Sequence, residues 1–156
     1  MTPNLPRDPS AAERIHFADE TGRCGLSEAA AVAAVAAALA HRDRAAVSIT
    51  VVVLDDESLR TLNREHLGHD WTTDVVTFPF ENPNGLEGEI YVSLDTAAAE
   101  AAAHGRSVDD ELTLYIVHGT LHLCGDDDHD PAARAAMRQA ERAVLATLGI
   151  AQDRFD

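Results

Sequence analysis

The chain has 156 residues and a net charge of −15 at pH 7, and this length suits one domain that buries its core without disulfide staples. Its two cysteines do not form a disulfide framework, and no apolar run is long enough to span a bilayer, so we expect a cytoplasmic protein with no membrane partner. The negative charge disfavours nonspecific binding to nucleic acid, and an RNA ligand would need a local arginine-lined groove or a metal ion.

Hydrophobic periodicity predicts a single domain over residues 11–156, after a leader over 1–10 that we expect to be disordered. Four strands are expected, at 14–18, 47–54, 75–79 and 88–93; the second reads as buried largely on both faces, and Pro79 ends the third or places it at a sheet edge. Five helices are expected. Three begin after N-cap residues: the first after Ser27, the second after Asp55 or Asp56, and the third after Asp95. The fourth begins at Val108 or Asp109, and the fifth runs from the N-cap Asp130 to about Leu148. This order predicts an α/β or α+β fold, with a small mixed four-stranded sheet covered by about five helices.

The most informative segment begins at His118. His122 lies four residues further on, so the two imidazoles share one face of a helix, about 40° apart around its axis. Gly125 is typical of a helix end, and His129 follows a run of three aspartates at 126–128. Three neutral imidazoles with a fourth position open to water form a catalytic zinc site, although nickel, cobalt or iron also suit such ligands. We therefore predict a metal-hydrolase domain that holds one Zn²⁺ on a helix and the loop after it.

The residues around the histidines narrow the chemistry. Metalloproteases with an H-E-x-x-H motif use the glutamate as general base, but here that position is Gly119, which disfavours peptide hydrolysis. The acidic run could ligate the metal, orient an imidazole, act as general base or be a solvated turn, and we take Asp126 and Asp127 as the candidate catalytic groups. Cys124 is expected to point into the core.

The motif H-G-T-L-H-L-C-G at 118–125, with T-D-V at 73–75 and F-P-F at 78–80 upstream, closely resembles the YbeY family of bacterial rRNA-maturation endoribonucleases. The correspondence runs in matching order from about Val47 to the C-terminus. The resemblance implies an α/β fold, a single zinc ion held by three histidines, and single-strand-specific cleavage of RNA. It also implies work in 16S rRNA 3′-end maturation and ribosome quality control, with rRNA and the small ribosomal subunit as partners.

Two departures from the family pattern bear on the site. The third histidine of the family comes ten residues after the first, where this chain has Asp128; we assign the third ligand to His129, assuming one inserted aspartate, with Asp128 as the alternative. Leu67 stands where the family has an arginine, and leucine cannot stabilise negative charge on a phosphorane-like transition state. Arg64 or Arg60 could substitute from the same helix.

The main hypothesis is thus a metal-dependent endoribonuclease. Its metal ligands would be His118, His122 and His129, and its substrate groove would include Thr73, Asp74 and Arg64. Leu67 favours one alternative, a ribosome-assembly binding factor with weak or lost catalysis. Another alternative is a metal hydrolase that acts on a different substrate.

Overall fold

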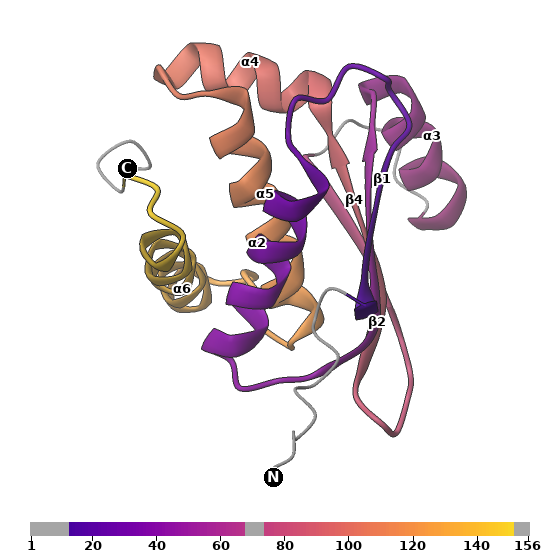
Figure 1. Ribbon diagram of the computed structural model, residues 1–156, viewed down its shortest axis with the longest axis vertical. Helices are drawn as coiled ribbons and strands as arrows, with labels where there is room; N and C mark the ends of the chain where they lie inside the picture. Colours follow the sequence, from indigo (N-terminus) through magenta and orange to yellow (C-terminus); the bar gives the residue numbers. More distant parts are fainter. Residues whose placement is uncertain (1–12, 68–73, 152–156) are drawn as a thin grey trace, which may run out of the picture.

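A computed structural model describes residues 13–67 and 74–151 (Figure 1). The elements follow the order β1 (Ile15–Asp19), α2 (Glu28–His41), β2 (Ala46–Leu54), α3 (Asp56–Leu67), β3 (Val75–Phe80), β4 (Leu86–Ser93), α4 (Leu94–His104), α5 (Val108–Leu123) and α6 (Pro131–Thr147). The four strands and the five helices of these ranges confirm the predicted α/β fold. The leader expected at 1–10 lies outside the described residues, and the extent of the domain over 11–156 stays a prediction.

The sheet is mixed, with the strand order β1-β2-β4-β3. β1 and β4 both pair in parallel with β2, whereas β3 pairs antiparallel with β4. β3 is thus an edge strand, as Pro79 predicted, because a residue without an N–H weakens an interior ladder. β3 and β4 are joined by the short turn at 81–85, so the start of β3 lies beside the end of β4, near α4.

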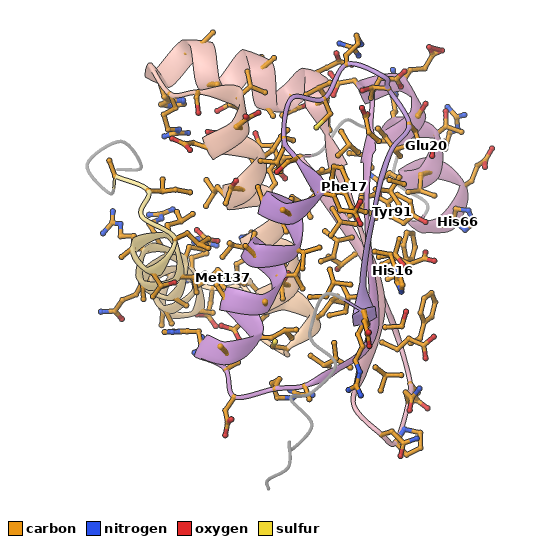
Figure 2. All side chains as sticks on the ribbon, in the orientation of Figure 1. His16, Phe17, Glu20, His66, Tyr91 and Met137 are labelled. Carbon is orange, nitrogen blue, oxygen red and sulfur yellow. The ribbon has the colours of Figure 1, made fainter. Side chains whose placement is uncertain are left out.

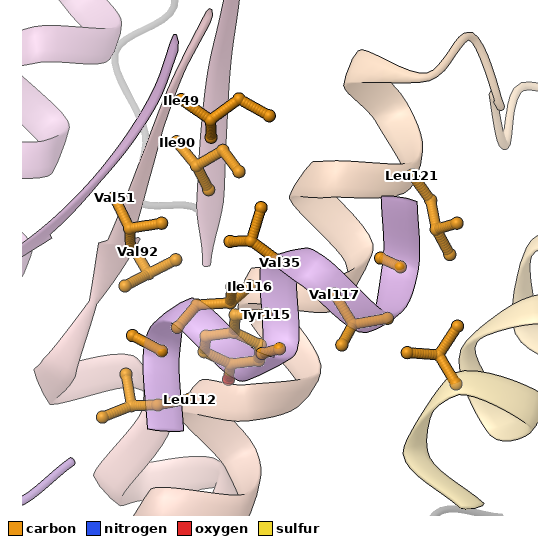
Figure 3. Close-up of a cluster of buried hydrophobic side chains, with 14 of the residues drawn as sticks. Val35, Ile49, Val51, Ile90, Val92, Leu112, Tyr115, Ile116, Val117 and Leu121 are labelled. Atoms are coloured by element: carbon orange, nitrogen blue, oxygen red, sulfur yellow. The ribbon is translucent and has the colours of Figure 1, made fainter. Parts of the chain in front are cut away.

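Helix α5 lies at the centre of the molecule. It packs against β3 and β4 of the sheet and against α2, α4 and α6 (Figure 1). Its apolar side chains meet those of the strands and of α2 in one core (Figure 3), with the contributing residues Val35, Ile49, Val51, Ile90, Val92, Leu112, Tyr115, Ile116, Val117 and Leu121. In the described part of the chain, every helix is too short or too polar to cross a membrane.

The two faces of the sheet differ in burial. Side chains of β2 that face α2 and α5 are fully buried, whereas Thr50 and Val52 on the other face are half-buried. The prediction that β2 is buried on both faces was therefore wrong for the second face. Among the described elements, α3 covers that face (Figure 1). Tyr91 of the sheet and His66 of α3 lie on this side (Figure 2). The Phe78 ring meets both rings edge to face, with centroids 5.7 Å from Tyr91 and 5.8 Å from His66.

Most predicted helix caps are confirmed. Ser27, Asp55 and Asp130 accept main-chain N–H bonds in the first turns of α2, α3 and α6. The cap predicted for α4 was wrong: Ser93 accepts the N–H of Thr96, and Asp95 lies inside the first turn. The Asp95 carboxylate instead accepts the main-chain N–H of Asp56, at 2.8 Å, and so joins α4 to α3.

Candidate metal centre

Two histidines lie on a partly exposed side of a helix that is otherwise mostly buried. Ten of the sixteen residues of α5 are buried, but His118 and His122 are only half-buried, one turn apart at its C-terminal end. Their Nε2 atoms lie 3.0 Å from each other, and their rings meet edge to face with centroids 4.6 Å apart. The spacing of four residues thus brings both imidazoles to one point, as predicted.

The second nitrogen of each ring is held by an acceptor. His118 Nδ1 hydrogen-bonds the carboxylate of Glu141 on α6, and His122 Nδ1 donates to the main-chain oxygen of Asp126, at 3.0 Å. When both Nδ1 atoms carry a proton, both Nε2 atoms present lone pairs to the same point. Metal-binding histidines are usually oriented in this way, by a carboxylate or a carbonyl on the far nitrogen.

A carboxylate completes the cluster. One oxygen of Asp128 lies 3.7 Å from Nε2 of His118 and 3.8 Å from Nε2 of His122. The three donor atoms all lie within 4.8 Å of one another. Two imidazole lone pairs and a carboxylate repel one another, and a divalent cation is the group that such a donor set binds. The residues therefore fit a metal ion.

The side chain found beside the two imidazoles is that of Asp128, the alternative candidate for the third ligand. Asp128 joins the two histidines, whereas the exposed His129 is not part of the donor group. His129 directly precedes Asp130, the N-cap residue of α6. The assignment of His129 as a ligand stays a prediction.

The two aspartates proposed as catalytic groups differ in their surroundings. Asp126 forms an ion pair with Arg42, and its side chain is 15% exposed. Asp127 is exposed, and its carboxylate accepts a long 3.4 Å hydrogen bond from the main-chain N–H of His129. Neither is among the described residues that line the cleft beside His118. Their catalytic role stays a prediction, with Asp127 the one not held by an arginine.

A cleft of about 460 Å³ opens beside His118, between α6, α4, α5 and the start of β3. Asp74, which was predicted in the substrate groove, lines it together with His118 and Asp128. Thr73 lies outside the described residues. Arg64 is on α3, on the opposite face of the sheet from α5 (Figure 1), so it is not brought to this cleft.

The cleft is electrostatically suited to a cation. Burial lowers the pKa of His118, but the hydrogen bond and charge of Glu141, with the charges of Asp74 and Asp128, outweigh it and hold that pKa above its usual value. The same carboxylates attract a divalent ion to the imidazoles.

Sequence reasoning missed Glu141 and Arg42. Both residues are far from the histidine segment in the sequence, and hydrophobic periodicity does not predict which side chains of distant segments come into contact. One signal was available for Glu141: it is the only acidic residue of α6, a helix that also carries three arginines. For Arg42, which ends α2, we find no such signal.

Arg42 and Arg44 hold the loop that follows the histidines. Nε of Arg42 donates to Asp126 at 2.9 Å, and Nη1 of Arg44 donates to the carbonyl of Cys124 at 3.0 Å. Cys124 itself is half-buried against the core, as expected, and burial raises the pKa of its thiol. Since the carbonyl of Asp126 orients His122, Arg42 acts on the imidazole through the loop.

We expect Arg42→Gln to weaken metal binding by about tenfold, the lower end of the effect of losing a group that orients a ligand. The measurement is a zinc titration against a competing chelator. Arg23→Gln is the matched control, because Arg23 forms an exposed ion pair with Asp95, away from the loop. Equal affinities of the two variants would show that Arg42 does not position His122.

The fold and this cluster define a class: small α/β proteins with a candidate metal centre at the end of a central helix. The family described as Endoribonuclease YbeY matches residues 17–149, and the chain belongs to this family.

Relatives and a solved structure agree with this membership. An endoribonuclease YbeY of Rhodopirellula baltica is 44% identical over 134 residues, which is 84% of this chain and 66% of that protein. Another, from Chlorobium phaeovibrioides, is 41% identical over 83% of this chain and 87% of its own length. The solution structure of TM1509 from Thermotoga maritima matches with a TM-score of 0.58 and 22% identity, over 86% of this chain and 91% of that one. That likeness shows the fold.

Proposed function

We propose that this chain is a zinc-dependent endoribonuclease specific for single strands, which acts on rRNA of the small ribosomal subunit in the cytoplasm. Its role would be 16S rRNA 3′-end maturation and ribosome quality control. The observation that carries the proposal is the convergence of His118, His122 and Asp128 at a cleft, in a chain of the YbeY family.

The residues of the site would divide the work. A zinc ion held there would acidify a bound water and offset negative charge on a phosphate oxygen. Glu141 and the main-chain oxygen of Asp126 orient the two imidazoles. Asp74 lies across the cleft, where its carboxylate would meet a nucleotide seated beside His118. Asp127 is the candidate general base, because the carboxylate of Asp126 is held by Arg42.

A second function, a ribosome-assembly factor with weak or lost catalysis, is favoured by one observation. Leu67 stands at the family's arginine position and offers no positive charge to a phosphoryl transition state. A factor of this kind would bind small subunits whether or not a metal is present.

The test is cleavage of a single-stranded oligoribonucleotide with the 16S 3′-end sequence, beside the same strand annealed to its complement. We expect the zinc-loaded protein to cut the single strand only, and the chelated protein to cut neither. An intact single strand in the presence of zinc-loaded protein would contradict the nuclease. Metal-independent co-sedimentation of that protein with small subunits would then support the assembly factor.

A further inference from the structure

A row of arginines follows one face of α6. Arg134, Arg138 and Arg142 are each four residues apart, so they share one face of the helix at steps of about 6 Å along its axis. All three are exposed, whereas Met137 between them points into the core (Figure 2). We call these three residues the arginine stripe.

The stripe borders a groove that begins at the metal centre. The cleft that contains His118 and Asp128 is also lined by Arg134 and Arg138. A second hollow of about 390 Å³ shares Arg138 with it and continues along α6 to Arg142. The two hollows together form a path from the donor cluster along the helix.

The carboxylates of this path are mostly engaged. Glu111 is buried and accepts a 2.7 Å bond from Arg106, which is buried beside it. Glu141 holds His118, and Asp128 belongs to the donor cluster. Glu100 lies 3.7 Å from Nδ1 of His104. Asp74 and Glu100 line only the hollow at the metal end, and the second hollow is lined by Arg106, Arg138 and Arg142, so the far end of the path is basic. A chain with a net charge of −15 thus carries a local positive strip beside its candidate metal centre.

We propose that the arginine stripe binds the phosphates of single-stranded RNA on one side of the cleaved bond and leads the strand to the metal centre. The proposal rests on the proposed function and names how its substrate is held. Evenly spaced guanidinium groups along a groove suit a polymer with a regularly repeated negative charge, and Arg binds phosphate oxygens with two parallel hydrogen bonds. Such a strip is the local groove that an acidic chain needs to bind RNA at all.

The stripe also bears on Leu67. Leu67 of α3 stands where the family has an arginine. Helix α3 packs on the opposite face of the sheet from α5 (Figure 1). At the cleft, the positive charge comes from the arginines of α6 instead. The stripe would bind phosphates that flank the reacting one, so it would act mainly on substrate affinity and not on the chemical step.

The test measures binding of a short fluorescent single-stranded RNA to the zinc-loaded protein by anisotropy, over a range of salt concentrations, with RNA length checked on a gel. The variant is Arg138→Gln with Arg142→Gln. The matched control is Arg14→Gln with Arg23→Gln, which removes the same charge from residues that line neither hollow. We expect the stripe variant to bind about 25-fold more weakly at 0.1 M salt, about fivefold for each lost phosphate contact, with a salt slope lower by about 1.4.

The control variant is expected to bind within about twofold of the unaltered protein, and all three proteins should carry equal zinc. Unchanged binding by the stripe variant would overturn the proposal, as would an equal loss in both variants. Weakened RNA binding by the stripe variant would support the proposal even if the unaltered protein cuts no RNA. The test can therefore contradict RNA binding by the stripe independently of the nuclease activity. If the stripe variant keeps its RNA affinity but no longer binds an acidic peptide, the stripe binds a protein partner. That result would also overturn the proposal.

Discussion

Replacing His122 by alanine is expected to remove bound zinc and to reduce RNA cleavage to background. The imidazole is one of three donor groups within 4.8 Å of one another, and no other described histidine joins that group. Losing a residue that only orients a ligand already costs about 10–100-fold in metal affinity, so losing the ligand should cost at least about 100-fold. Metal content after dialysis and cleavage of single-stranded RNA are the two measurements.

Two further variants identify the third ligand. Asp128→Ala should behave like His122→Ala, whereas His129→Ala should keep its zinc, because Asp128 is the residue whose carboxylate faces both imidazoles. Loss of zinc from the His129 variant together with retention by the Asp128 variant would restore His129 as the ligand. Stoichiometric zinc in His122→Ala would refute the metal centre altogether.

The substitution Gly119→Glu, which would restore the H-E-x-x-H motif, is expected to prevent folding and not to create a protease. A Cβ atom at Gly119 would lie 2.7 Å from a methyl of Ile90, 3.2 Å from Val75 and 3.3 Å from Thr77. Even the methyl of Gly119→Ala should cost about 1–3 kcal/mol of unfolding free energy by overpacking. A glutamate adds a carboxylate that is buried among apolar side chains without a partner.

Urea unfolding of the alanine variant and the soluble yield of the glutamate variant test this expectation. Ala99→Glu serves as control, since Ala99 is exposed on α4 and a new carboxylate there remains in water. A Gly119→Glu protein as stable as the control would show that α5 can move away from the sheet. The contacts of Gly119 give a packing reason for its presence, because α5 lies close against β3 and β4 at this residue.

Local patterns accounted for most of the fold and for half of the site. The β-branched run of β2 and the histidine spacing on α5 depend only on neighbours in the chain, so both could be predicted. Glu141 could not, because it reaches His118 from another helix. The choice between Asp128 and His129 depends on how the loop turns after Gly125, and one residue of offset decides which side chain faces the imidazoles.

The candidate ligands come from two environments that differ in rigidity. His118 and His122 belong to the helix around which the core is packed, so their positions are tied to the packing of α2, α4, α6, β3 and β4. Asp128 belongs to a loop with few buried side chains. Sequence drift can therefore exchange the third donor, an imidazole for a carboxylate, without disturbing the core, whereas a shift of the first two would be felt throughout the domain. In evolutionary terms the helix preserves the centre, and the loop is where its affinity and metal preference can change.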